Sequence, residues 1–451
     1  METGVMPASR RNLLTGFLLA ILMLAAVSCY ADFFFARFFV VKRNIPGDFD
    51  LYYRGGQMLL SGERNIYSKE VYRQFFKNDP EVAKEHYFYF NKLNYPPLIY
   101  AAFSPFCRWR PERVKSAWFY LNCLLLIASV ALLFFLKPAQ ALPWKLKGPA
   151  MALVLFYCFL FSPVNENLFR GQVNILLLFF LALTVFFYDR RWSAAAGAAL
   201  GAAAAVKILP GFLFLAFFIR KDYRAIIWGL LAILFLYLAV VAAFGPGVID
   251  SYLSNRDSSY SSLYSNVHPF NKSIPAMLTR LFSRGPSWRP LIDAPFLVFP
   301  ITILLSAFVL AASVGLGLVL ARQIEDGPAA GTLTILLFSQ ALFLLSPLVF
   351  AHHMVTSLML LPMFVPLLLQ YKKPGGISLS GCVIMLAAVA ALGIFAGIIP
   401  DAFHFDAKRL WEMRIAFQDN FLGQITNMAA WGGLAAYIYG EYCTAPRDGG
   451  G

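Results

Sequence analysis

An aspartate just beyond the first long apolar stretch is the residue of this sequence best placed to do chemistry. Asp48 lies in the segment 47–53, GDFDLYY, where a chain that leaves a lipid bilayer first meets water. A carboxylate at that depth can take a proton from a hydroxyl group while the other reactant stays dissolved in lipid. We therefore expect Asp48 to act as a general base.

A second aspartate two positions later raises the question of a metal ion. Asp48 and Asp50 form a D-x-D pair, whose carboxylate oxygens are ligands that divalent cations accept. The two side chains share a side in an extended segment but diverge by about 200° on a helix. An aspartate near the end of a span is also commonly a helix cap. The sequence thus requires no cofactor and leaves a divalent metal ion at Asp50 open.

A lysine and a group of three polar residues are suited to recognise a sugar or a phosphate. Lys207 lies beside Pro210 between apolar segments, so it either snorkels to the interface or meets a buried anion. Arg170, Gln172 and Asn174 crowd one turn, where guanidinium and amide donors suit phosphate oxygens and sugar hydroxyls. We expect all four residues to bind the donor of a transferred group.

The histidine pair His352-His353 follows an apolar segment that ends at Phe350. Adjacent side chains point in different directions, so one imidazole can be packed while the other faces a phosphate. The sequence does not say which of the two acts. The residues expected to contact an acceptor or to lie on its loops are Tyr52, Tyr53, Arg256 and Asn271.

The elements that hold these residues must be membrane helices. Hydrophobic residues make up 59% of the chain and aromatic residues 16%, and the mean hydropathy is +0.63, which is too apolar for a soluble globular protein. Apolar stretches recur along the whole chain and suffice for about 11 crossings of a hydrocarbon core roughly 30 Å thick. We expect an all-α polytopic membrane protein in which 1–443 form one transmembrane domain and 444–451 a short flexible cytoplasmic tail.

Charge indicates how the chain is oriented. The net charge of +14 comes from short basic clusters between apolar spans, which is the pattern of membrane topology signals and not of a nucleic-acid-binding surface. With these clusters in the cytoplasm, both termini are cytoplasmic and the polar residues above lie on the extracytoplasmic face. The six cysteines show no CxxC spacing and indicate neither a metal site nor a disulfide framework.

Local patterns predict four further features. The stretch 13–41 is a retained helix, because it is too long for a signal-peptide core. Residues 193–219 form a hairpin of two short helices with Lys207 at its tip, and the small residues of 194–202 allow close helix packing. Residues 98–106 re-enter the membrane without crossing it. Residues 55–62 form an interfacial segment that ends at a glycine.

Several motifs in their order along the chain resemble a known family. They are Asp48-Phe49-x-x-Tyr52-Tyr53, Leu60-x-Gly62 with Tyr67, Tyr95-Pro96-Pro97-Leu98, Gly171-Gln172-x-Asn174, Lys207-x-x-Pro210, and Ser346-Pro347 with His352-His353. The chain resembles the polytopic sugar transferases of the C-type glycosyltransferase fold and, within them, glycosyltransferase family 87, also called the domain of unknown function 2029. This resemblance implies transmembrane helices with interfacial helices on the outer face.

The resemblance also implies an activity. It implies a hexosyltransferase in a bacterial-type plasma membrane, which moves a sugar from a polyprenyl-phosphate carrier to a lipid or glycan acceptor. The sugar is typically mannose, as in phosphatidylinositol-mannoside synthesis, or arabinofuranose in some relatives. Phe350-Ala351 stands where some mannosyltransferases of the family carry Trp-Asp, which leaves the sugar open. The alternative is a transporter or flippase of a glycolipid or polyprenyl-linked sugar.

Overall fold

The computed structural model describes residues 48–79, 93–136, 144–254, 271–285, 290–323, 328–360 and 423–443. Every regular element in these ranges is a helix. The first half holds α2 (Asp48–Leu60), α3 (Lys69–Phe75), α5 (Pro97–Phe103), η1 (Ser104–Arg108), α6 (Pro111–Phe134), α8 (Trp144–Leu160), α9 (Ser162–Arg170), α10 (Asn174–Asp189) and α11 (Ser193–Val206). The second half holds η2 (Leu209–Leu213), α12 (Phe214–Ile219), α13 (Tyr223–Phe244), α14 (Gly247–Ser254), α16 (Ile274–Phe282), η4 (Pro295–Leu297), α17 (Val298–Gln323), α18 (Pro328–Leu345), η5 (Ala351–Leu360) and α23 (Gly423–Cys443).

Among the described residues, three helices are long and apolar enough to cross a membrane. They are Pro111–Phe134, Tyr223–Phe244 and Pro295–Arg322. A fourth crossing could be the pair Lys147–Cys158 and Pro163–Arg170, which is bent by 60°. The described part of the chain is therefore all-helical, and the protein is an integral membrane protein. The count of about 11 spans stays a prediction, and the predicted helix 13–41 and the tail 444–451 lie outside the described residues.

Small residues bring two helices of the bundle into close contact, as the sequence predicted. Gly197 and Gly201 of α11 face Ala225 and Gly229 of α13, and a Cβ atom on either α11 glycine would overlap the carbonyl oxygen of its partner. Ala225 is fully buried at this contact. Without a hydrophobic force between helices in lipid, such backbone approach is what holds them together.

The predicted hairpin with Lys207 at its tip is confirmed. Helix α11 ends at Val206, the backbone of Lys207 is extended (φ −149°, ψ 128°), and the chain turns into η2 at Leu209 and then α12. Phe217 of α12 returns to Tyr188 at the far end of α10, with ring centroids 5.2 Å apart. The reversal leaves the lysine at one end of the bundle.

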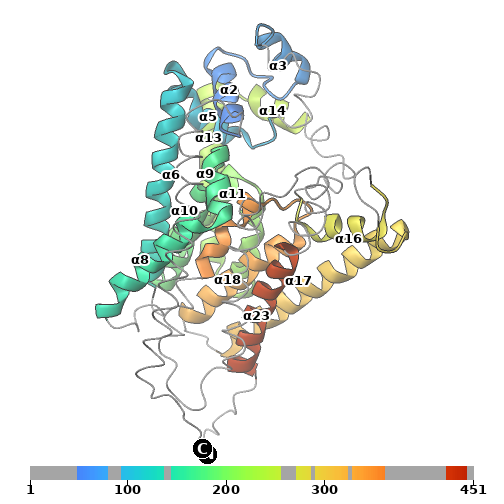
Figure 1. Cartoon of the computed structure of the whole chain (residues 1–451). Coiled ribbons are helices and arrows are strands. Elements are labelled where there is room, and N and C mark those ends of the chain that lie inside the picture. Colours follow the sequence, from blue (N-terminus) through green and yellow to red (C-terminus); the bar gives the residue numbers. More distant parts are fainter. Residues whose placement is uncertain are drawn as a thin grey trace, which may run out of the picture.

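Four short helices, α2, α3, α5 and α14, gather at that same end (Figure 1). Helix α5 has seven residues and a length of about 10 Å, too short to cross a bilayer. The rings of Tyr95 and Tyr52 lie 5.0 Å apart, and the Tyr53 hydroxyl donates to the carbonyl of Trp109 at 2.6 Å. Since both ends of this segment meet α2, it does not cross a bilayer, and its re-entry into the membrane stays a prediction.

The predicted glycine stop of α2 is also present. Gly62 has φ +94°, and the N–H groups of Gly62 and Glu63 bond back to the carbonyls of Leu59 and Met58 at 3.1 and 2.9 Å. These two bonds form a Schellman motif, which needs a residue in the left-handed region at its turn. The motif fixes where α2 ends.

The basic turns lie at the other end of the bundle. The guanidinium of Arg190 donates to the carbonyl of Phe135 at 3.3 Å, which joins the C-terminal ends of α10 and α6. Lys221 follows the end of α12, close to the Tyr188 and Phe217 contact. Helix α10, with 16 residues, separates this basic end from Asn174 by about 24 Å.

Candidate active site

A sharp turn after α9 organises the polar residues. The N–H of Gln172 donates to the carbonyl of Asn167 at 2.9 Å, and the N–H of Gly171 donates to the carbonyl of Leu168 at 3.3 Å. Gly171 has φ +64°, as this Schellman motif requires. The indole N–H of Trp118 donates to the Gly171 carbonyl at 2.8 Å. The turn is thereby tied to α6.

We expect Gly171→Ala to destabilise the protein and to lower its activity. A Cβ atom at Gly171 would lie 2.6 Å from the Cβ of Phe49, and the left-handed backbone adds strain, for a total of about 1–3 kcal/mol. Phe49 is the second residue of α2, directly after Asp48, and its side chain is fully buried. Thermal unfolding in detergent would measure the loss. A variant as stable as the wild type would contradict this account of the turn.

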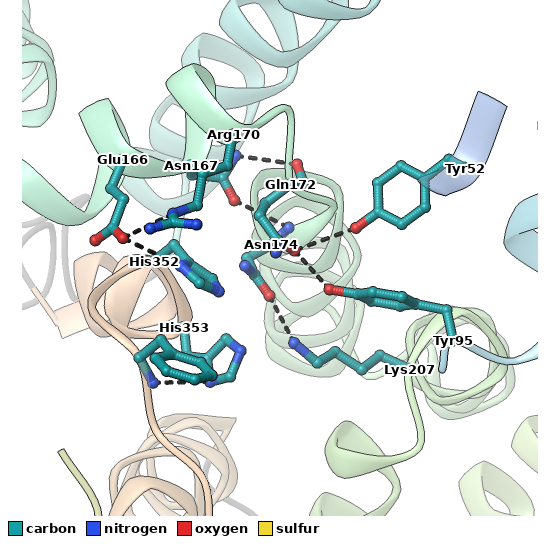
Figure 2. A network of polar contacts seen from close by, with 11 residues as sticks. Tyr52, Tyr95, Glu166, Asn167, Arg170, Gln172, Asn174, Lys207, His352 and His353 are labelled. Atoms are coloured by element: carbon teal, nitrogen blue, oxygen red, sulfur yellow. Dashed lines mark hydrogen bonds and ion pairs between the residues drawn. The ribbon is translucent and has the colours of Figure 1, made fainter. Parts of the chain in front are cut away.

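Amide side chains spread from the turn to three other segments. Asn167 donates to the Gln172 carbonyl at 3.1 Å and accepts from the N–H of Asn174 at 3.1 Å. The Gln172 side-chain oxygen accepts from the hydroxyls of Tyr52 at 3.2 Å and Tyr95 at 2.6 Å. These bonds join α2, the segment before α5, and the start of α10. Figure 2 shows the resulting network, which we call the polar cluster: Tyr52, Tyr95, Glu166, Asn167, Arg170, Gln172, Asn174, Lys207, His352 and His353.

Lys207 lies in this cluster and not in open water. Its ammonium donates to the side-chain oxygen of Asn174 at 3.1 Å and stands 5.6 Å from the centroid of the Tyr95 ring. Burial lowers the pKa of Lys207 to about 8, and the negative charge of Asp48 acts against this shift. The predicted base and the predicted cation are therefore close enough to influence each other.

Asp48 begins α2 and is half-buried. Asp48 and Asp50 both belong to the first turn of this helix, so their side chains diverge by about 200°. That geometry disfavours one metal ion held by both carboxylates. Among the described residues, no group of three or more His, Cys, Asp or Glu side chains could hold a metal ion.

The two histidines have different surroundings. His353 accepts at Nδ1 from the N–H of Phe350 at 3.2 Å. Burial lowers the pKa of His353 well below its usual value, and the positive charge of Lys207 lowers it further, so its ring is neutral and carries the proton on Nε2. His352 instead points Nδ1 toward the carboxylate of Glu166, 3.6 Å away. Its ring stacks on Phe350, with centroids 5.5 Å apart.

Glu166 was not predicted as a site residue from the sequence, yet its carboxylate lies beside both Arg170 and His352. Arg170 donates to its carboxylate at 2.9 Å, one helical turn further along α9. The spacing of four residues between Glu166 and Arg170 is the signal that could have indicated this pair.

Lys272 was also missed. It is 3% exposed, and its positive charge acts on Glu166. Its backbone N–H bonds to the carbonyl of Val349 at 2.6 Å, and the neighbouring Asn271 side chain accepts from the Val349 N–H at 3.0 Å and donates to the Pro347 carbonyl at 3.1 Å. This docking of a loop onto the chain before η5 leaves no local trace in the sequence.

Three residues expected at the acceptor are buried in the structure. Tyr52 is fully buried and Tyr53 is 7% exposed, and both hydroxyls bond within the protein. Asn271 is fully buried as well. These bonds position α2 and the chain before η5, and contact of these residues with an acceptor stays a prediction. Arg256 lies outside the described residues.

Some polar atoms of the site have no hydrogen-bond partner although they are buried. They are Nδ2 of Asn174, Nδ1 of His352, and both polar atoms of the Asn165 side chain. A buried polar group without a partner costs about 1–3 kcal/mol. Such groups are rare in folded proteins, so their presence here, beside several cations, is consistent with a site that binds a polar ligand.

Comparisons with known proteins found one family and one curated relative. The model of glycosyltransferase family 87 matches residues 93–347, which is more than half of the chain. A curated relative, the polyprenol-phosphate-mannose-dependent alpha-(1-2)-phosphatidylinositol mannoside mannosyltransferase of Mycobacterium tuberculosis, is 30% identical over 141 residues, or 30% of this chain. The chain spans 33% of the length of that relative. No solved structure matches the chain.

Proposed function

This chain belongs to glycosyltransferase family 87, and on that premise we propose that it moves a hexose from a polyprenyl phosphate to a lipid or glycan acceptor. The observation that carries the proposal is the polar cluster around Lys207, which donates to Asn174 at 3.1 Å, together with Asp48 in the first turn of α2. The charge of Asp48 acts on Lys207, and the charge of Lys207 acts on His353. A base and phosphate-binding groups are thereby brought together from three distant parts of the chain.

In the proposed reaction, Asp48 takes the proton of the acceptor hydroxyl as its oxygen attacks the anomeric carbon of the sugar. The bond between that carbon and the phosphate oxygen breaks, and the phosphate keeps the electron pair. Attack from the face opposite the phosphate inverts the anomeric configuration. A phosphate leaves readily, so the protein mainly positions the reactants and stabilises the developing negative charge.

The charges of the site support a phosphate-linked donor. Lys207, Arg170 and Lys272 supply positive charge, whereas Asp48 and Glu166 supply negative charge. The excess is positive, as suits a phosphodiester with its single negative charge. Gln172 and Asn174 supply amide groups of the kind that recognise sugar hydroxyls.

The membrane setting supports a prenyl-linked donor. The polar cluster lies at the ends of α10 and α11, and the basic turns after α10 and α12 lie at the opposite end. If basic turns are cytoplasmic, the site is extracytoplasmic and both chain termini are cytoplasmic. The prenyl tail would then remain among apolar helices while its phosphate reaches the cluster.

Mannose is the first sugar to test, because the curated relative is named for a polyprenol-phosphate-mannose donor. The experiment is to incubate purified protein in detergent with radiolabelled polyprenyl-phosphate sugars and a lipid extract, without a divalent metal and with Mg²⁺. Consumption of donor with a new labelled product supports a transferase. A flippase, the alternative function, would leave the donor intact in detergent because no compartment boundary exists there.

A further inference from the structure

The carboxylate of Glu166 is shared between two helical elements. Its oxygen accepts from Nε of Arg170 at 2.9 Å within α9 and lies 3.6 Å from Nδ1 of His352 in η5. Helix α9 and η5 pack directly against each other. The His352 side chain is 6% exposed and the Glu166 side chain 26%, so this interaction is partly shielded from water. Interactions between charged groups are stronger in such surroundings than at a surface.

The two adjacent imidazoles have different charged neighbours. His352 faces the carboxylate of Glu166, and a carboxylate stabilises the positively charged form of an imidazole. His353 faces the ammonium of Lys207 and has its Nδ1 atom occupied by the Phe350 N–H. Figure 2 shows His352 between Glu166 and the part of the cluster that contains Asn174 and Lys207. Of the two imidazoles, His352 is the one that lies beside a carboxylate.

We propose that Glu166 is a positioning residue that orients His352 toward the departing phosphate, and that His352 is the imidazole that stabilises it. The inference rests on the proposed transfer reaction. The donor phosphodiester carries one negative charge, and the phosphate gains a second when the bond to the sugar breaks. A positively charged imidazole that donates a hydrogen bond from Nε2 meets this added charge, and no proton needs to leave His352.

A double-mutant cycle tests the assignment. Glu166→Gln removes the charge with little change in shape and is expected to lower kcat about tenfold or more, and His352→Asn about a hundredfold. Because Glu166 acts through His352, adding Glu166→Gln to His352→Asn is expected to cause no further loss. With His353→Asn, the effect of Glu166→Gln is expected to remain in full. Glu166→Asp should recover part of the activity and serves for the same cycles if Glu166→Gln does not fold.

Asp293→Asn is the matched control. It breaks another arginine–carboxylate pair, Arg284 to Asp293 at 2.6 Å, whose side chains are 80% and 45% exposed. Exposed pairs contribute little, so this variant is expected to keep wild-type kcat. Independent losses from Glu166→Gln and His352→Asn, or coupling of Glu166 to His353 instead, would overturn the inference.

Product binding separates this inference from the proposed function. Binding of a polyprenyl phosphate to detergent-solubilised protein can be measured whether or not any sugar is transferred. Glu166→Gln and His352→Asn are each expected to weaken it, again without adding. If the wild type transfers no sugar but shows this coupling, the proposed function fails and the inferred phosphate site stands. If transfer occurs and neither variant weakens binding, only the inference fails.

Discussion

Replacing Asp48 by Asn is expected to reduce sugar transfer by a factor on the order of 10³ while leaving donor binding nearly unchanged. A general base contributes about 10²–10⁴ to the rate of a proton transfer, and the amide cannot accept the proton of the acceptor hydroxyl. The Asn side chain has almost the same shape, so α2 should keep its contacts through the buried Phe49. The measurement compares kcat and donor binding for the two proteins in the same detergent.

Asp50→Asn is the control in the same helical turn. Asp50 points about 200° away from Asp48 on α2, so its replacement should leave most of the activity intact. Equal and large losses in both variants, relieved by a divalent cation, would instead favour the D-x-D metal pair. Turnover by Asp48→Asn at the wild-type rate would remove Asp48 from the mechanism.

Replacing Lys207 by Gln is expected to lower kcat by a factor of about 10²–10³, since a preorganised charge at a developing anion contributes that much. Glutamine can still donate to Asn174, which accepts from Lys207 at 3.1 Å, so the loss reports the missing charge more than a missing hydrogen bond. Circular dichroism and thermal unfolding of the variant would establish that the helices are retained.

The pH dependence of transfer provides a second test of Lys207. Burial lowers the pKa of Lys207 to about 8, so the ammonium is charged below that pH and loses its proton above it. Activity that needs this charge should fall as the pH rises through about 8. In Lys207→Arg the guanidinium stays charged, so the activity of this variant should not fall as the pH rises through about 8. An identical alkaline limb in the wild type and the arginine variant would show that another group causes the decline.

Features encoded by short stretches of sequence could be predicted. The small residues of α11 indicated its close packing with α13, and the position of Lys207 beside Pro210 indicated a hairpin tip. The proline pair before α5 indicated a segment that does not cross. In each case the relevant forces act between residues that are neighbours in the chain or share one helix face.

Features that depend on contact between distant segments of the chain could not be predicted from the sequence. Tyr52 is a polar residue in an interfacial motif, and only its bond to Gln172, 120 positions away, makes it a buried packing residue. The side chain of Asn271 satisfies the backbone near Val349 for the same kind of reason. Periodicity says which face of a helix is apolar but not which partner that face will meet.

The same limit explains why Glu166 was overlooked. In the sequence it stands among amide residues and reads as part of a polar turn, and its role emerges only when η5 brings His352 to α9. The choice between the two histidines was likewise open in the sequence, because adjacent residues differ only in direction. Their surroundings, a carboxylate for one and an ammonium for the other, distinguish them.

The anomeric configuration of the product tests the central claim most directly. Purified protein would be given a polyprenyl-phosphate sugar of known configuration, and the new glycosidic linkage would be determined by nuclear magnetic resonance. Single-step attack assisted by Asp48 predicts a linkage of the opposite configuration to the donor in every product molecule. A retained configuration, or sugar found covalently attached to Asp48, would contradict the mechanism.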